Sequence, residues 1–355
     1  MNTYLAVAVL FLFTGCLLVF PLLPALVELR FKTDAQPLNV IQQHAGEIRH
    51  FANGFRTYIS GLQPSLQQCI STRTIARGVL PDGCEYLILG KHEGRAALHI
   101  REKDGTCELV IVAGTELATP AGITFHHEIY SAEEFIGGEA NYYRAIFGEK
   151  EVHLGPGSSL MRWAHAGERF ITGPDCKLYG RVSSDGVIRL ARNNQFLRLN
   201  APRIEFGDSG DDRSWPQPDV YGKEHSRIVG RLLRDGDYEV AGGEVVAGSV
   251  VARGRLLLRS GARVCGSVKA REMVLEPGVM VEGSVISSRT MRIGAGCAVH
   301  GPIIAEREMI IAAGTCCGTF SQPTTISSLR IRIEEGVVVF GTVWARESGQ
   351  LVAPS

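Results

Sequence analysis

The sequence has no excess of either charge and contains few aromatic residues. Its 37 Lys and Arg residues balance 37 Asp and Glu residues, so the formal net charge is zero, which argues against a general electrostatic nucleic-acid binder. Aromatic residues make up only 7% of the chain, whereas glycine occurs 41 times, and this combination favours small repeated units with tight turns over one large aromatic core. The 45% of hydrophobic residues excludes a wholly disordered chain.

Motifs for catalysis and metal binding are also missing. The sequence contains no Walker loop, no HExxH, no G-x-S-x-G and no paired CxxC. His126 and His127 are adjacent, so on a regular strand they point to opposite faces and cannot both ligate one metal ion. The same objection applies to Cys316 and Cys317. We therefore predict a protein that is not an enzyme and has no catalytic residue, metal or cofactor.

One surface site remains open. Arg162, Trp163 and His165 are close together in the sequence and could form a ligand site, although a corner of a repeated fold explains them equally well.

The first 27 residues carry no charge, and they predict a membrane anchor over residues 1–29. The apolar run exceeds the about 20 residues that cross a bilayer as a helix. A cleaved signal peptide would need basic residues before the run and a shorter apolar core. A lipidated Cys16 would normally be followed by polar residues, and here the chain stays apolar. The residues we expect to contact lipid are Leu5, Leu10, Phe11, Leu17, Phe20 and Leu26.

The flanks of the run set its expected orientation. Arg30, Lys32, Arg49 and Arg56 follow it and nothing basic precedes it, so the positive-inside rule predicts a single-pass inner-membrane protein whose carboxy-terminal part is cytoplasmic. The odd number of nine cysteines, with no disulfide or zinc spacing, agrees with a reducing compartment.

Residues 30–64 predict a short helical collar. After Pro37, apolar residues recur near helical spacing with basic residues between them. Such a helix either lies on the membrane surface, attracted by anionic lipids, or packs on the next domain. The sequence leaves both options open.

The carboxy-terminal third is a repeat. Glycines recur at intervals of 17 or 18 residues, with one interval of 23 that an inserted loop around Gln322 explains. Aliphatic residues alternate at fixed offsets from each glycine, which is strand periodicity in short pieces. Counted from Gly318, the same offsets place Cys316 and Phe320 in the inward-facing rows that these aliphatic residues form. The repeating glycines are Gly248, Gly266, Gly283, Gly301, Gly318 and Gly341. The predicted solenoid core is Val246, Val250, Leu256, Leu258, Val264, Val268, Val281, Val285, Ile293, Val299, Ile303 and Ile311.

This pattern predicts an all-β fold, a parallel β-helix or β-solenoid with 16–18 residues per coil. A helical reading fails because no 3.6-residue period fits the glycine spacing. We expect irregular strands and then a first solenoid block over residues 65–207. A polar connector follows over 208–237, the clear repeat spans 238–348, and the tail is 349–355. Whether the two blocks form one continuous stack stays open.

One class of enzyme uses similar coils. Hexapeptide acyltransferases are built on 18-residue solenoid turns and carry a catalytic histidine. Here the aliphatic residue expected at every sixth position is not kept, and His300 has no evident catalytic partner. The sequence therefore disfavours an acyltransferase.

The rows G-x-V-x-G-S-V and L-x-L-x-x-G between about Tyr238 and Ser348 resemble the bactofilins, bacterial polymer-forming cytoskeletal proteins. The resemblance covers about a third of the chain. It implies a right-handed, roughly triangular parallel β-helix that assembles end to end without nucleotide. It also implies a structural role in cell shape, envelope organisation or the positioning of partners. The chain departs from the family's usual plan, a short central domain between disordered tails, because an anchor, a collar and another solenoid block come first.

A solenoid has two ends with unpaired strand groups, which proteins either cap or use. No strong capping helix follows Gly341, so Val337, Val339, Phe340 and Val343 are the candidate polymer interface. The alternative is that Trp344 and the tail fold over this end.

Two functions follow from the sequence. The first is a non-enzymatic, membrane-tethered cytoskeletal scaffold that forms a homopolymer and organises the bacterial envelope or cell shape. Its expected partners are its own copies, membrane lipid and envelope-synthesis proteins, with no nucleic acid and no nucleotide. The alternative is a non-polymerising solenoid that binds an envelope polysaccharide or a protein partner.

Overall fold

The computed structural model describes residues 9–15, 17, 20–23, 49–90, 105–207, 227–228 and 230–354. The chain divides into two units, Met1–Gly46 and Glu47–Ser355. In the first unit, residues 9–15 are helical and η1 (Phe20–Leu22) is a 3-10 turn. No helix among the described residues is long and apolar enough to span a membrane. Of the predicted anchor, Leu10, Phe11, Leu17 and Phe20 are exposed, whereas Leu5 and Leu26 lie outside the described residues.

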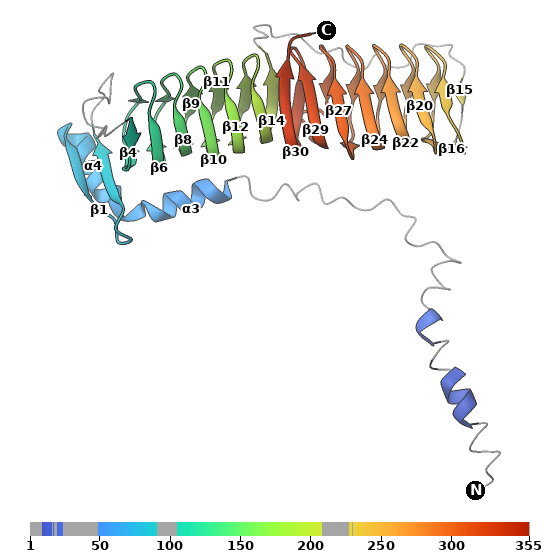
Figure 1. The fold of residues 1–355 in the computed structure, drawn as a ribbon, viewed down its shortest axis with the longest axis horizontal. Helices are drawn as coiled ribbons and strands as arrows, with labels where there is room; N and C mark the ends of the chain where they lie inside the picture. Colours follow the sequence, from blue (N-terminus) through green and yellow to red (C-terminus); the bar gives the residue numbers. More distant parts are fainter. Residues whose placement is uncertain are drawn as a thin grey trace. The chain divides into compact units, whose positions relative to one another are not determined.

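The second unit is an all-β parallel solenoid of about 12 turns with few helices, as the repeat predicts (Figure 1). Its helices precede the coils and are α3 (His50–Tyr58), η3 (Ser60–Leu62) and α4 (Gln63–Thr72). The helical segment therefore ends at Thr72, eight residues beyond the predicted boundary at residue 64, and the left-handed residue Arg73 caps it.

Strands β2 to β14 form the first block, and β1 (Ile75–Val79) pairs with β2 antiparallel. The block's strands are β2 (Glu85–Leu89), β3 (Thr106–Cys107), β4 (Val110–Ala113), β5 (Leu117–Ala118), β6 (Thr124–Ser131), β7 (Phe135–Ile136), β8 (Tyr142–Gly148), β9 (Glu151–Leu154), β10 (Ser159–Ala166), β11 (Arg169–Thr172), β12 (Lys177–Ser184), β13 (Val187–Leu190) and β14 (Gln195–Phe206).

Strands β15 to β30 form the second block. They are β15 (Arg227–Ile228), β16 (Leu232–Arg234), β17 (Tyr238–Val240), β18 (Val245–Val246), β19 (Val250–Ala252), β20 (Arg255–Leu258), β21 (Arg263–Val264), β22 (Val268–Leu275), β23 (Met280–Val281), β24 (Val285–Ile293), β25 (Ala298–Val299), β26 (Ile303–Ala305), β27 (Glu308–Ile311), β28 (Cys316–Cys317), β29 (Thr324–Glu334) and β30 (Val338–Val352). The block starts before the predicted boundary at residue 238, and the predicted tail continues the last strand.

Each strand pairs in parallel with the equivalent strand one coil away, so like side chains stack into inner rows. One inner row is Val250, Val268, Val285, Ile303, Ile326 and Val343. All of the predicted solenoid core residues are fully buried. Glycines fit the turns between strands because a side chain would meet the coil below: a Cβ on Gly248 would lie 2.0 Å from the Gly230 carbonyl oxygen.

Two predicted inner positions are wrong. Ile326 takes the row position expected of Phe320, which is 79% exposed in the inserted loop. In the neighbouring row Cys317 aligns with Val299 and is fully buried, whereas Cys316 aligns with Ala298 and points partly outward. At Phe320 the inserted residues 319–323 delay the next strand, so counting forward from Gly318 fails. Cys316 precedes the insertion: Cys317 lies 18 residues after Val299, whereas Gly318 lies only 17 after Gly301, so counting back from Gly318 misses by one residue.

Candidate functional site

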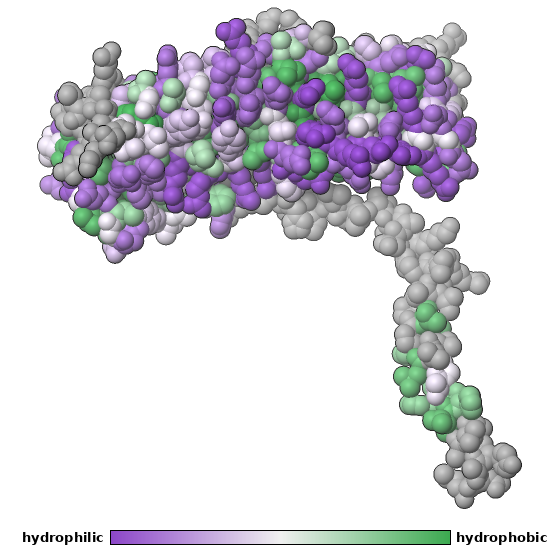
Figure 2. Space-filling view, viewed as in Figure 1, coloured by the Kyte–Doolittle hydropathy of each residue, from purple (hydrophilic) through white to green (hydrophobic). Residues whose placement is uncertain are grey.

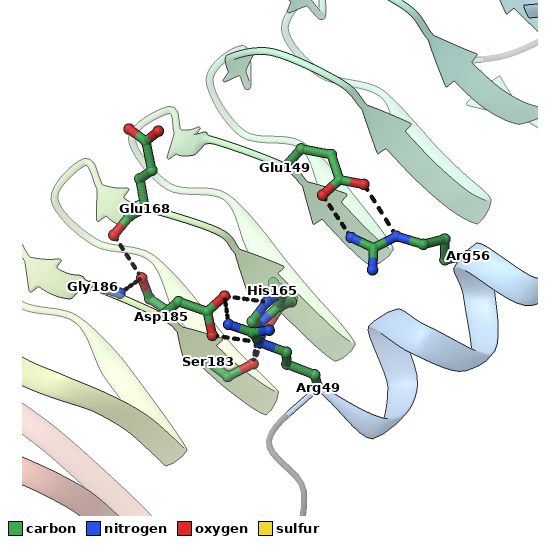
Figure 3. Close-up of polar contacts among 10 residues, drawn as sticks. Arg49, Arg56, Glu149, His165, Glu168, Ser183, Asp185 and Gly186 are labelled. Carbon is green, nitrogen blue, oxygen red and sulfur yellow. Dashed lines mark hydrogen bonds and ion pairs between the residues drawn. The ribbon is translucent and has the colours of Figure 1, made fainter.

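Helix α3 is held on one face of the first block by two arginine–carboxylate pairs, which Figure 3 shows. Arg49 donates through Nε to Asp185 Oδ1 at 2.8 Å and through Nη2 to Oδ2 at 2.6 Å. Arg56 binds Glu149 with two bonds of 3.2 and 2.6 Å, and Tyr130 donates its hydroxyl to the same carboxylate. Of the two options for the collar, the structure therefore shows packing on the solenoid.

Aromatic contacts complete this docking. Trp163 is 7% exposed and packs against Phe51 and Phe55, with ring centroids 6.3 and 6.0 Å apart. The Arg181 guanidinium lies over the Phe51 ring at 5.3 Å. For Trp163 the sequence left open a surface ligand site or a corner of the fold, and the structure places it at the centre of a helix-to-solenoid contact.

His165 lies beneath the same helix and is 3% exposed. Its Nδ1 lies 2.9 Å from Ser183 Oγ and its Nε2 lies 3.6 Å from Asp185 Oδ2 (Figure 3). These three residue types also form hydrolase triads, but here both Asp185 oxygens bind Arg49 and Ser183 is itself buried. His165, Ser183 and Asp185 therefore help to hold α3 on the solenoid, and they are not accessible to a substrate.

We expect His165 to make the stability of this protein depend on pH. Burial lowers the pKa of His165, and Arg49 and Arg56 lower it further, while Asp185 raises it. The unfolded chain, with a histidine pKa of about 6.5, then binds more protons than the folded one below that pH. The free energy of unfolding should thus fall as the pH drops below about 6.5. Denaturant unfolding at pH 7.5 and 5.5 should show a smaller loss in His165→Gln than in the parent.

The control for this measurement is His126→Gln, because the His126 side chain is 47% exposed beside Glu108. That variant should lose as much stability on acidification as the parent. Equal losses in the parent and in His165→Gln would refute a role for His165.

Elsewhere on the first block, Glu134, Glu151 and His153 bring three possible metal ligands within 4.8 Å of one another. His153 Nε2 lies 3.0 Å from Glu151 and 3.3 Å from Glu134, and Arg169 also binds Glu151. These contacts with one another and with Arg169 account for the closeness of the three side chains without a metal ion. The pair His126 and His127 belongs to no such group among the described residues.

The described cysteines are all free thiols. Burial raises the pKa of Cys176, Cys297 and Cys316 to about 11 and that of Cys317 well above its usual range. Neutral buried thiols are poor nucleophiles. They therefore act as small core residues.

The carboxy-terminal end of the second block meets the carboxy-terminal end of the first. Strand β30 pairs antiparallel with β14, and Leu199 lies opposite Val343 while Ile204 lies opposite Val339. Backbone bonds extend the contact, because the Phe206 amide donates to the Val337 carbonyl at 3.1 Å. The two blocks form one continuous stack in which the chain reverses direction (Figure 1).

Side chains also join the two blocks. Asn200 Nδ2 donates to Thr342 Oγ1 at 2.6 Å, and the Arg198 guanidinium lies 5.3 Å from the centre of the Trp344 ring. Gly349 faces the Phe196 ring so closely that a Cβ there would lie 2.3 Å from it. A groove of about 240 Å³, lined in part by Tyr179, crosses this junction.

The prediction of an open carboxy-terminal end is therefore wrong. Val337, Val339 and Val343 are fully buried at or beside the junction, and Phe340 lies between them in the same strand. The physical reason is that β14 already pairs with the edge that a second copy would need. Trp344 and residues 349–352 of the predicted tail do not fold over this end, because they belong to β30 itself.

The opposite end of the second block differs. Among the described residues, β15, β16 and β17 pair only with the next coil, through β18, β19 and β20. Leu232 and Tyr238 are only partly buried, although Val250 and Leu256, their equivalents one coil further on, are fully buried. This end of the solenoid, which sequence reasoning missed, is here called the first-coil end.

Residues 221–321 match the family model described as Bactofilin, polymer-forming cytoskeletal. The chain contains a bactofilin domain. The matched residues include the first-coil end and run to the loop after β28. Neither the comparison with curated proteins nor that with solved structures finds a match. Bactofilins are structural, polymer-forming proteins of the cytoskeleton, so the site to consider is an assembly surface.

Proposed function

We propose that this protein is a membrane-tethered scaffold of the bactofilin type. It associates with its own copies through a solenoid end, needs no nucleotide, and helps to organise the bacterial envelope or cell shape. The observation that carries the proposal is the bactofilin domain with its partly exposed first-coil end. Strand edges and apolar rows left unpaired at such an end favour pairing with another solenoid.

The tether in this proposal is the apolar amino-terminal run. Most of its described side chains are large, apolar and exposed, and Leu10 and Phe11 are 62% and 74% exposed. Figure 2 shows green, hydrophobic surface along the described part of this segment. A bilayer would cover this surface. The proposed location is the inner membrane, with one crossing and the solenoid in the cytoplasm, where lipid and envelope-synthesis proteins are the expected partners.

The tether is tested by flotation of the full chain with vesicles of phosphatidylglycerol and phosphatidylethanolamine. The parent should float with the vesicles, and Leu10→Arg/Phe11→Arg should lose most of that binding because two guanidiniums oppose entry into hydrocarbon. Phe320→Arg is the matched control, since Phe320 is 79% exposed in a solenoid loop. Full flotation of the double variant, or loss in the control, would contradict an amino-terminal tether.

A further inference from the structure

The groove at the junction of the two blocks lies where the pairing of β14 with β30 is irregular. Between Phe196 and Arg198, β14 advances two residues, whereas β30 advances five, from Gly349 to Trp344. The extra residues of β30 cannot all pair with β14, so the two strands separate locally beside Leu197, which lines the groove. Bulges of this kind are common next to binding and active sites, where they turn side chains toward a ligand.

Two arginines of β29 line this groove. Arg330 and Arg332 are two positions apart on one strand, so they point to the same outer face, and both are exposed. Within the part of the chain that the structure describes, neither side chain has an ion pair or a hydrogen bond. A guanidinium binds a carboxylate with two parallel hydrogen bonds. The groove therefore offers two unpaired cationic groups to an anionic ligand.

The other polar side chains of the groove suit hydroxyl groups. Gln195 lies opposite Gln350 across the junction, and both amides are exposed. Glu347 adds a carboxylate from β30. An amide both donates and accepts hydrogen bonds, and a carboxylate accepts them from a hydroxyl. The carboxylate also repels a ligand that carries negative charge along its whole length. The lining therefore matches a ligand with one anionic group and several hydroxyls.

Tyr179 provides an aromatic wall. It is 45% exposed, and its ring and hydroxyl contact no partner among the described residues. The face of an aromatic ring carries partial negative charge and attracts positively polarised C–H groups. A sugar ring presents a face of C–H groups with hydroxyls at its rim. It can therefore lie on Tyr179 while its hydroxyls reach the amides.

We infer that this groove binds an acidic saccharide. The carboxylate of one sugar unit pairs with Arg330 and Arg332, and the ring of that unit lies against Tyr179. The groove of about 240 Å³ is smaller than the about 300–1,000 Å³ typical of drug-sized ligand sites, so it holds about one sugar unit. Strands β12 and β14 of the first block and β29 and β30 of the second form the site together, so it exists only where the blocks meet (Figure 1). This binding goes beyond the scaffold function and is independent of self-association.

The test uses the full chain in a detergent without a sugar head group and follows a titration with trigalacturonic acid by saturation-transfer NMR. The acidic trimer should bind, and the uncharged galactose trimer should bind at least about tenfold more weakly, because it lacks the carboxylate that faces the arginines. Glutamate at the same carboxylate concentration should not displace the acidic trimer. Absence of binding, equal binding of the two trimers, or displacement by glutamate would overturn the acidic-saccharide site and leave the scaffold function standing.

Variants locate the site. Arg330→Gln/Arg332→Gln should weaken binding of the acidic trimer at least about tenfold. Arg292→Gln is the matched control, because Arg292 is exposed in the same outer row as Arg332, two coils away through Ile310, and lies outside the groove. It should bind the trimer like the parent. Tyr179→Ala should also weaken binding, and circular dichroism checks that each variant is folded. Parent-like binding by the double arginine variant, or an equal loss in Arg292→Gln, would refute this site.

Discussion

Replacing Leu199 with Arg should separate the two blocks at the junction. Leu199 is fully buried, lies beside Val182 in its own block and lies opposite Val343 of the other. Truncating a buried leucine already costs about 2–5 kcal/mol, and an unpaired guanidinium in the same place costs more. Separating β14 from β30 lets solvent reach the guanidinium and loses only the hydrogen bonds between these two strands. Unfolding a block would lose more, because each coil is otherwise still paired within its block.

Hydrogen exchange measures this opening directly. In Leu199→Arg, amides of β14 and β30 should exchange much faster, whereas those of β22 and β24 in the second block should stay protected. The control is Leu197→Arg, because Leu197 is partly exposed and lines the groove at the junction. Loss of protection throughout both blocks would show that the junction does not open as a separate unit.

Such a variant also bears on assembly. Opening the junction frees the edges of β14 and β30, which gives each copy further unpaired strands in addition to the first-coil end. Leu199→Arg should therefore form larger assemblies than the parent at the same protein concentration. The same substitution should thus lower the free energy of unfolding and increase the number of copies in each assembly.

The coils could be predicted because residues close together in the sequence determine each of them. Each row of the repeat carries its own glycine turn and its own alternating aliphatic residues, so Val250, Val268 and Val285 are found at the correct inner position by spacing alone. The prediction fails where an insertion changes the count, as it does between Phe320 and Ile326. Spacing carries no information on how many residues a loop adds before the next strand begins.

The junction of the two blocks and the docking of α3 could not be predicted, because each contact joins residues that lie far apart in the sequence. Asn200 and Thr342 are 142 positions apart and belong to blocks with different repeat quality. Nothing in either strand specifies an antiparallel partner, since an edge strand can pair with any compatible edge. The docking of α3 is of the same kind, because Arg49 and Asp185 are 136 positions apart and their pairing depends on how the coils stack.

Removing one complete coil should leave the second block folded. Deletion of residues 268–284 takes out one coil of the inner row, so that Val285 replaces Val268 above Val250 and Ile293 replaces Leu275 above Leu258. A solenoid coil contacts only its neighbours, so the free energy of unfolding should drop by about one coil's share and the rod should shorten by about 4.8 Å. Circular dichroism and a denaturant melt measure both the retained strand content and the loss of stability.

The matched deletion removes residues 268–276, which is about half of that coil. It cannot keep the register, because the following strands arrive on the wrong side of the solenoid and the turn residues Pro277 and Gly294 would take the inner-row positions of Val268 and Val285. We expect this variant to lose the strand signal of the second block and to be cleaved by protease between β18 and β28. If the half-coil deletion were as stable as the full-coil deletion, stacking of like residues could not be what holds the block together. If both unfolded, the coils would depend on contacts beyond their neighbours, and the junction with β14 would be the first place to look for them.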